Sequence, residues 1–532
     1  MISGTVWEDR LLSFRIDRHD KTQLELKLDY GLQPSAKKQS YHLETFIFVP
    51  KVLAMTAKTY PPERFYADTA SFIRMTTPKV PLSELSRKSA VRPWASDIKE
   101  QIERFSRGEP ADVGAAEQGL KLLACVFKAA VKNEHIAVRT AIAGAINDEQ
   151  WKQAGKKLTR FTDDLETALM RLTKVGDHSD NPEVPLVLKE GWAAVDEYAS
   201  LLAEEALTDL VALADVDQTS QRLGEAIDRA RSVAIAQYHH RRSQGCMSYA
   251  HTGERNEHLP HRWRVLKRYV SSALYLSVER DKSGQFATEL AGMAAAALAM
   301  LFATVAILVI QQLWAASLSA AFLSAMVLSY VIKDRVKDLG KRHLGRRLKK
   351  SMSDHIIRVC GHDGSEIGQV KESFRVREVG QLPEDIQTLR YAHLSSQIAI
   401  EGRPETVLCY RKDITLSSAS LSAQFAKAEG LTDVVRLNLQ PMLAHMDDGR
   451  ETYRYIHPTT HEVVETECAR VYHINVVLHF VNGEGATHTH RIRAILNKTG
   501  ILRVEFADQP TEESHDPNSG TNGVAKIRIF DD

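Results

Sequence analysis

The sequence predicts an α+β multidomain membrane protein in which a two-helix transmembrane hairpin interrupts soluble domains. Three observations predict it. Residues 290–332 contain no charged side chain and no histidine, residues 95–240 have a helical period, and both ends of the chain have a strand period. The average composition hides this pattern, since the 532 residues carry a net charge of +1 and 43% hydrophobic side chains, as soluble globular proteins do. The near-neutral balance excludes a generally basic protein that coats nucleic acid.

In chain order, the changes of period and composition divide the sequence into seven segments. These are an N-terminal β-rich segment (1–94), an α-helical domain (95–260), a basic amphipathic juxtamembrane helix (261–289), a transmembrane helical hairpin (290–332), a basic juxtamembrane segment (333–353), a C-terminal antiparallel β domain (354–508) and a mobile tail (509–532).

The N-terminal segment alternates apolar and polar residues. Residues 22–30 place every second side chain on one face, and residues 41–49 form a second β-rich run, so both are expected to be strands. A short helix is expected after Pro62 and would carry Phe65, Tyr66, Phe72 and Ile73. Residues 76–93, which contain three prolines, read as a linker.

The central domain is expected to be a helical bundle. Asp112 and Asp148 are suited to capping helix N-termini. A stripe at three- and four-residue steps predicts a helix with one buried face. The stripe consists of Trp192, Val195, Tyr198, Leu202, Ala206 and Leu210.

The basic amphipathic helix has two interpretations. Its apolar face begins with Trp263, and Arg264 and Arg268 lie away from that face. Trp263, Arg264, Lys267 and Arg268 are the residues expected at the membrane interface. Such a helix lies along anionic headgroups in many membrane proteins. A soluble helix that packs the same face on the bundle would have the same pattern.

The uncharged segment is 43 residues long, about 65 Å as one helix and roughly twice the thickness of a bilayer core. We therefore expect two spans joined near Gln311 and Gln312, with Trp314 and Tyr330 at the membrane interfaces. A hairpin buried in a soluble protein, or one tilted span with an interfacial piece, are the alternatives. Small residues at four-residue spacing, such as Gly292 and Ala296, would let helices approach closely.

The flanks of this segment predict its orientation. Six Lys and Arg residues lie between 261 and 289, and nine lie between 333 and 350, beginning with Lys333, Arg335 and Lys337. Because positive flanks stay on the cytoplasmic side, we expect a two-span protein of the inner or plasma membrane with both termini in the cytoplasm. The expected partner of these cations is a bilayer with anionic headgroups, whereas nucleic acid is disfavoured because no aromatic residues are interleaved.

The C-terminal segment predicts an antiparallel meander, with strands at 434–443, 470–480, 487–496 and 501–506. If the hairpin returns the chain to the same side, the N-terminal strands can join this sheet. His479, His488 and His490 are candidate metal ligands, provided that one face of the sheet holds all three. An odd-length loop near Asn482 would instead align the apolar faces of the two strands and separate His479 from the other two, and we expect this register.

Other candidate chemistry is weak. Histidines 239, 240, 251, 258 and 261 surround Cys246, but their spacing matches no standard zinc site, and interleaved arginines favour a cationic surface. The sequence contains no phosphate loop, nucleophile elbow or metalloprotease motif, and it predicts no cofactor. Five dispersed cysteines indicate reduced thiols, and the charged N-terminus is unlike a signal peptide.

Two functional hypotheses remain. The first is a membrane-anchored protein whose two cytoplasmic modules bind partners or sense a signal, as an oligomeric scaffold or a membrane-acting effector. The second is a membrane-tethered enzyme, such as a metal-dependent hydrolase or nuclease, with its site in the C-terminal β domain. Because no catalytic motif is present, the sequence leans against enzymatic activity and names no catalytic residue.

Overall fold

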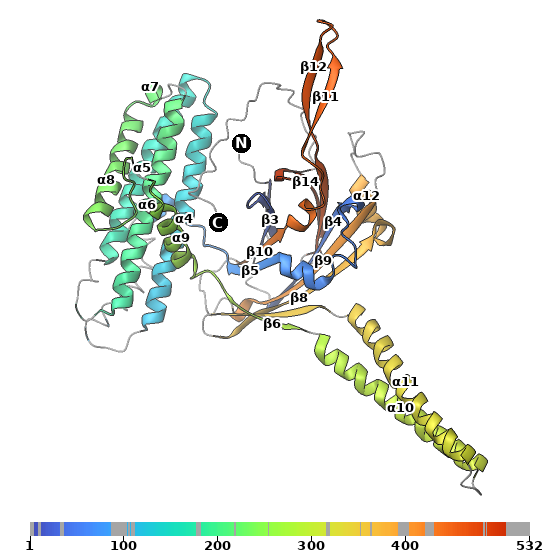
Figure 1. Cartoon of the computed structure of the whole chain (residues 1–532). Helices are drawn as coiled ribbons and strands as arrows, with labels where there is room; N and C mark the ends of the chain where they lie inside the picture. The colour runs from blue at the N-terminus through green and yellow to red at the C-terminus, as the bar shows by residue number, and fades with distance from the viewer. Residues whose placement is uncertain are drawn as a thin grey trace. The chain divides into compact units, whose positions relative to one another are not determined.

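The computed structural model separates the chain into two units, each of which is described by itself (Figure 1). The β unit combines Met1–Arg74 with Leu276–Glu513, and the helical unit contains Met75–Tyr275. The structure describes residues 5–8, 12–31, 37–86, 100, 104, 107, 112–176, 182, 184–216, 220–253, 255–282, 284–314, 320–351, 353–361, 364–391, 404–420, 430–481, 485 and 487–506. The expected mobile tail lies outside these residues.

The β unit contains two antiparallel sheets that draw strands from both ends of the chain. The larger sheet has the order β15-β14-β13-β4-β9-β8-β7-β6. Its strands are β4 (Lys38–Pro50), β6 (Ser277–Lys282), β7 (His355–Cys360), β8 (Glu366–Glu378), β9 (Glu405–Ser417), β13 (Tyr472–Val481), β14 (Thr487–Asn497) and β15 (Gly500–Phe506).

The smaller sheet has the order β1-β2-β3-β10-β5. Its strands are β1 (Thr5–Glu8), β2 (Leu12–Arg18), β3 (Gln23–Gly31), β5 (Thr69–Met75) and β10 (Gly430–Asn438). Short helical elements connect the strands of the two sheets. They are η1 (Lys51–Leu53), α1 (Pro62–Asp68), η2 (Val379–Gln381), α12 (Glu384–Tyr391) and α15 (Gln440–Leu443).

The two sheets pack face to face and share one apolar core. Tyr30 of β3 lies 5.1 Å from Tyr41 of β4 and 6.0 Å from Phe480 of β13, measured between ring centroids, and all three rings are buried. Since β4 pairs with both β9 and β13, the N-terminal segment lies inside the C-terminal sheet. Strands from the segments expected at 1–94 and 354–508 therefore form one domain, and the helical unit, which begins at Met75, is inserted into it.

The helical unit is a bundle, as the sequence predicts. The expected stripe is its core, since Val195, Tyr198 and Leu202 are fully buried. Asp112 caps the first long helix by accepting a hydrogen bond from the amide of Ala115 at 3.0 Å. The helices of this unit are α2 (Leu82–Leu85), α4 (Val113–Ala143), α5 (Asp148–Gly176), α6 (Leu186–Val216), α7 (Ser220–Leu223), α8 (Glu225–Ser243) and α9 (His258–Ser271).

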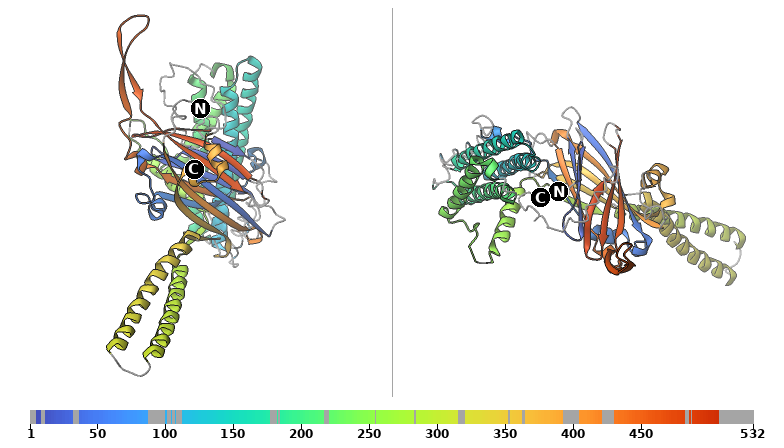
Figure 2. Two further views of the ribbon diagram at one scale, coloured as in Figure 1. Left: turned by 90° about the vertical axis from the view of Figure 1, so that its right-hand side faces the viewer. Right: turned by 90° about the horizontal axis from the view of Figure 1, so that it is seen from above.

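Two long helices, α10 (Gly284–Trp314) and α11 (Ala320–Ser351), are inserted between β6 and β7 of the larger sheet. They run side by side in all the views of Figures 1 and 2, and we call this pair the arm. A second excursion is a separate two-stranded sheet of β11 (Arg450–Ile456) and β12 (Val463–Ala469), which we call the ribbon (Figure 1).

Three local expectations are wrong in detail. Phe72 and Ile73 belong to strand β5 rather than to the helix after Pro62, because the chain becomes extended at Thr69. The strand expected over 434–443 ends at Asn438, and a short helix follows. Asn147, not Asp148, caps α5, since its side-chain oxygen accepts the amide of Gln150 at 2.9 Å.

Candidate functional site

The two helices of the arm meet along a seam of small side chains. Ala295, Ala299 and Ala303 of α10 are buried against α11 although their helix is otherwise exposed. A Cβ atom placed on Gly340 of α11 would lie 3.2 Å from the Cβ of Ala295. The start of α10 therefore faces the later part of α11, and small residues permit the close antiparallel approach that is common between membrane helices.

The outward faces of the arm are apolar and exposed. Leu301 is 63% exposed, and Val327 on the other helix is 65% exposed. Burying a large apolar side chain is worth roughly 1.5–3 kcal/mol, so such a surface is unfavourable in water and marks a lipid or protein contact. The exposed large apolar residues of the arm are Leu290, Met293, Leu298, Met300, Leu301, Phe302, Val305, Leu308, Val309, Leu323, Met326, Val327, Leu328, Tyr330, Val331, Ile332 and Leu339.

Among the helices in the described part of the chain, one segment, Gly292–Gln312 of α10, is long and apolar enough to cross a membrane. Helix α11 is apolar over 320–332 and becomes charged at Lys333. The structure therefore shows one candidate span and does not show two.

The predicted interfacial residues of the arm lie at this change of polarity. The ammonium of Lys333 is 3.8 Å from the ring centroid of Tyr330 and 3.9 Å from a carboxylate oxygen of Asp334. Arg335 and Lys337 are exposed one turn further along α11. The side chain of Trp314 lies outside the described residues.

The apolar face of α9 is covered by the helical unit. Leu266 and Val270 are buried, and the carbonyl of Val270 accepts the thiol of Cys125 on α4 at 3.4 Å. The ring of Trp263 stacks on Tyr198 of α6 with centroids 5.3 Å apart. The structure thus supports the second interpretation of this helix, in which its apolar face packs on the bundle. Arg264 and Arg268 are exposed, and Lys267 is half-buried.

The three candidate metal ligands of the C-terminal meander, His479, His488 and His490, do not all lie on one face of the sheet. His479 pairs with Thr489, whereas His488 pairs with Phe480 and His490 pairs with Leu478. Because paired residues point to the same side of a sheet, His479 lies on the face opposite to the other two histidines. The odd-length loop is confirmed, since strand pairing ends at Val481 and Thr487.

The histidines around Cys246 are engaged in separate local contacts. His240 lies 2.7 Å from a carboxylate oxygen of Asp196, and His258 lies 3.2 Å from the carbonyl of Tyr249. Burial, assisted by nearby carboxylates, raises the pKa of the Cys246 thiol to about 11. Within the described residues, no three histidine, cysteine or acidic side chains gather as a metal site would require.

Arg241 in the same region is a structural residue rather than part of a cationic surface. Its guanidinium is buried, donates to the hydroxyl of Ser200 at 3.0 Å and to the carbonyl of Ser248 at 3.1 Å, and pairs with Glu204. These contacts tie α8 to α6 and to the turn that follows α8.

A buried ionic cluster lies between the two sheets of the β unit, and the sequence did not predict it. Lys412 of β9 is 0% exposed, and its ammonium lies 2.5 Å from Asp433 of β10 and 3.4 Å from Glu372 of β8. It also donates to the hydroxyl of Ser71 at 3.1 Å, and Tyr410 donates to Glu372 at 2.6 Å. Burial lowers the pKa of Lys412, but the two carboxylates outweigh it and raise that pKa overall.

This cluster cross-links the two sheets, since Lys412 on β9 pairs with Asp433 on β10. Its charges face one another inside the core. A strand pattern in the sequence gives no sign of it, because Glu372 meets Lys412 only when β8 pairs with β9, and Asp433 meets Lys412 only when the two sheets pack.

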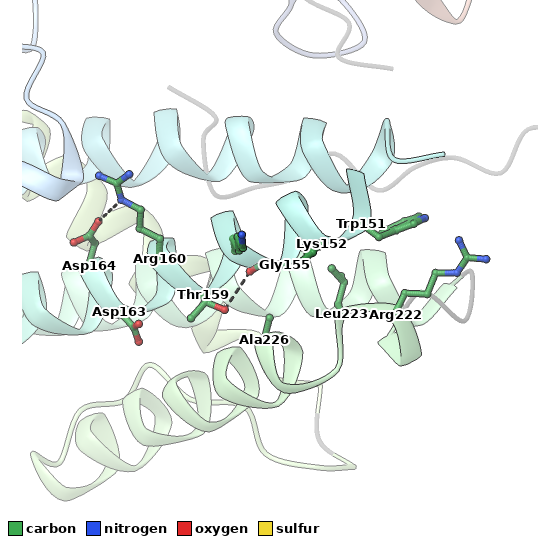
Figure 3. Close-up of a pocket in the computed structure, with 11 residues that line it drawn as sticks. Trp151, Lys152, Gly155, Thr159, Arg160, Asp163, Asp164, Arg222, Leu223 and Ala226 are labelled. Atoms are coloured by element: carbon green, nitrogen blue, oxygen red, sulfur yellow. Dashed lines mark hydrogen bonds and ion pairs between the residues drawn. The ribbon is translucent and has the colours of Figure 1, made fainter. Parts of the chain in front are cut away.

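A groove of about 550 Å³ lies on the helical unit between α5 and the helices α7 and α8 (Figure 3). Lys152, Lys156 and Arg222 line it, and Arg160 reaches across one turn to Asp164 at 3.7 Å. Its lining contains neither histidine nor cysteine, and the hydroxyl of Thr159 donates to the carbonyl of Gly155 at 3.1 Å. The groove is an open, charged surface of solvated helices.

Comparison of this chain with models of protein families, with curated proteins and with solved structures finds no match. The features of the molecule from which a function can be inferred are therefore its own: the arm, the ribbon and the strands that hold them. Among the described residues, more than half of the exposed large apolar side chains belong to the arm.

Proposed function

We propose that this protein is anchored in a lipid bilayer by its arm and that the β unit and the helical unit stay on the side from which the arm enters. The observation that carries the proposal is the pairing of the strands at the two ends of the arm. Lys282, just before α10, pairs with His355, just after α11, and the antiparallel pairing continues to Ser277 and Cys360. Two residues joined in one strand pair cannot lie on opposite faces of a membrane.

This pairing supports an even number of crossings. If Gly292–Gln312 of α10 crosses the bilayer, the chain must return before His355. Helix α11 lies directly against α10 and is apolar up to Ile332, so it is the segment available for the return. Two crossings with both termini on the entry side, as the sequence predicts, follow from this argument as our proposal.

The entry side is proposed to be the cytoplasmic face of the inner or plasma membrane. Lys333, Arg335, Lys337 and Lys341 lie along α11 next to its apolar part. Anionic lipid headgroups attract such cations by about 1 kcal/mol each, and positive flanks remain on the cytoplasmic side. Lys333, Arg335 and Lys337 are therefore proposed to lie at the membrane interface, as the sequence predicts.

The ribbon is the surface on which we place contact with a protein partner or with a second copy. Every residue of β11 is exposed, and so is every residue of β12 except Val464. One face carries ion pairs such as Arg450 with Glu467 at 2.9 Å, while the other carries Tyr453 and Tyr455 with rings 6.3 Å apart. An isolated two-stranded ribbon is at best marginally stable in water, and exposed tyrosines are favoured at protein interfaces. A membrane-held scaffold or effector is the role that fits these parts.

Membrane extraction tests the anchor. The full chain should stay with membranes in alkaline carbonate and should leave them only in detergent. The control variant replaces residues 283–352 by Gly-Asn, which keeps Ser353 and Asp354 and joins Lys282 to His355 through a four-residue turn. This variant should fold and should be found in the soluble fraction.

Two outcomes would contradict the anchor. One is release of the full chain by carbonate, and the other is retention of the variant without the arm. The strand pair makes the comparison fair, because β6 and β7 are antiparallel neighbours whose facing ends, Lys282 and His355, a short turn can join.

A further inference from the structure

We propose that the arm is a short membrane hairpin, with about 20 Å of paired apolar length, which enters bilayers that are thin or that it thins locally. This inference rests on the proposed membrane anchor and adds the class of bilayer that it recognises: a thin hydrocarbon layer with anionic headgroups on the entry side. The register of the two helices, the place where each becomes apolar and the polarity of the tip lead to it.

The register is set by Ala295 and Gly340, which lie at the same height along the arm. A second contact agrees, since Gly292 lies against the side chain of Lys341. Seven residues nearer the tip on each helix, Phe302 therefore lies level with Lys333. Phe302 is the middle residue of the candidate span Gly292–Gln312, so the charged part of α11 begins beside the centre of that span.

Both helices become strongly apolar at this same height. In α10, seven of the ten residues in 301–310 are large and apolar, against four of the eleven in 290–300, where alanine predominates. In α11, eight of the eleven residues in 322–332 are large and apolar, and the next residues are Lys333, Asp334 and Arg335. One boundary across the pair, at Phe302 and Lys333, therefore separates an apolar tip half from a charged and alanine-rich half.

The tip half is too short for an ordinary bilayer. From Phe302 to Trp314 the helix rises about 18 Å, and from Ala320 to Lys333 it rises about 20 Å, whereas the hydrocarbon core of a typical bilayer is about 30 Å thick. Fuller insertion would carry Lys333, Asp334, Lys337 and Asp338 into hydrocarbon. The direction of side chains on α11 makes this worse, because helical side chains point toward the N-terminus, which here is the tip. The ammonium of Lys333 accordingly lies over Tyr330, one turn nearer the tip.

Shallow insertion into a bilayer of ordinary thickness is no better. Gln311 and Gln312 are exposed near the tip and would rest close to the middle of the hydrocarbon, where their amides have no water to bond. If the bilayer is thin, Gln312, about 15 Å beyond Phe302, comes close to the far headgroups while Lys333 and Arg335 remain at the near ones. Polar groups at both ends of a short apolar band thus match a thin bilayer, and the basic end matches anionic lipid.

Partition of the purified full chain between two vesicle populations tests the inference. Both populations contain phosphatidylcholine and phosphatidylglycerol, one with 14-carbon and one with 18-carbon monounsaturated chains, and one is loaded with sucrose so that they can be separated by density. We expect about a tenfold excess of protein in the thin vesicles. An even distribution, or an excess in the thick vesicles, would overturn the inference.

Two matched variants test whether the apolar length of α11 causes the preference for thin vesicles. Substituting leucine for Lys333, Asp334, Arg335, Lys337 and Asp338 extends the apolar part of α11 to Leu339, by about 10 Å, and should move the protein toward the thick vesicles. Glutamine at the same five positions removes the charges without adding apolar length and should keep the preference for thin ones. If the leucine variant distributes as the native chain does, the length argument is refuted. If the native chain binds neither population, the membrane anchor itself fails.

Discussion

Replacing Lys412 by methionine should destabilise the β unit far more than any surface change. The ammonium of Lys412 is 0% exposed and lies between Asp433 at 2.5 Å and Glu372 at 3.4 Å. Methionine fills much of the same volume but leaves two buried carboxylates without their cation. Ser71 and Tyr410 donate hydrogen bonds to this cluster, but they cannot neutralise its charge.

The size of the effect follows from the chemistry of a broken buried ion pair. Removing one partner typically costs about 3–5 kcal/mol, since an uncompensated charge stays in the low-dielectric interior. Replacing the whole cluster by neutral groups costs much less. The triple variant Lys412→Met, Glu372→Gln and Asp433→Asn should therefore recover most of the loss, because its amides can still bond the hydroxyls of Ser71 and Tyr410.

Hydrogen exchange measured by mass spectrometry is the suitable assay, because it reports the opening of the β unit separately from the helical unit. Peptides from β9 and β10 should exchange roughly 10² to 10⁴ times faster in Lys412→Met than in the native chain. Lys371→Met, at an exposed position beside Glu372 on β8, should leave exchange almost unchanged. An increase below about tenfold in Lys412→Met, or a triple variant as unstable as the single one, would refute the idea that the cluster cross-links the sheets.

Three further predictions concern other buried or close contacts. A hydrogen bond to Glu44 is the main cause that raises the pKa of His42, and with the contact to Asp413 it outweighs the opposing effect of partial burial. These contacts should therefore stabilise the β unit below pH 6.5 and weaken as pH rises through the raised pKa, and urea titrations of His42→Gln should lose that pH dependence. A Cβ on Gly430 would lie 2.0 Å from the carbonyl oxygen of Tyr30, so Gly430→Ala should lower the urea midpoint by an amount equivalent to about 1–3 kcal/mol, whereas Gly380→Ala, with open space around it, should not. Arg241→Met should lower the melting temperature of the helical unit by several degrees through the loss of its buried hydrogen bonds, and the exposed Arg242→Ala serves as its control.

Local patterns predicted the elements of this protein well, and the reason is physical. The absence of charge over 290–332 and the helical stripe in α6 are both properties of neighbouring residues, so they can be recognised without knowing which distant segments meet. The odd loop before Thr487 was predictable for the same reason, because only one register puts both apolar faces on the same side.

Partners distant in the sequence were not predictable in this way. Alternation marks β4 as a strand, but nothing within Lys38–Pro50 states that β9 and β13 will flank it. The helical unit therefore looked like a separate middle domain between two β segments, when it interrupts a single one. Lys412 and Asp433 each look like an ordinary polar strand residue until the two sheets bring them together.

The candidate site was predictable only in part. The face of α9 around Leu266 is equally suited to lipid and to a helical bundle, and packing on α4 and α6 decides between them. No pattern in the sequence predicted the ribbon. Its apolar and charged residues alternate along strands whose two faces are both exposed, so neither face stands out as a buried one. The boundary within the arm also escaped sequence reasoning, since an apolar count over 43 residues averages a strongly apolar tip with an alanine-rich base.

The way the arm is attached explains why its length matters. Both helices start from adjacent paired strands of one sheet, so neither can slide along the other to hide a mismatch without breaking the seam at Ala295 and Gly340. A single helix in a bilayer of the wrong thickness tilts, but a seamed pair fixed at its base resists adjustment of one helix alone. In the proposed anchor, the charges that begin at Lys333 therefore set the insertion depth for both helices at once. A bilayer deforms more easily than a hairpin held in this way, so local thinning of the membrane is the deformation that we propose to accommodate its apolar and its charged ends together.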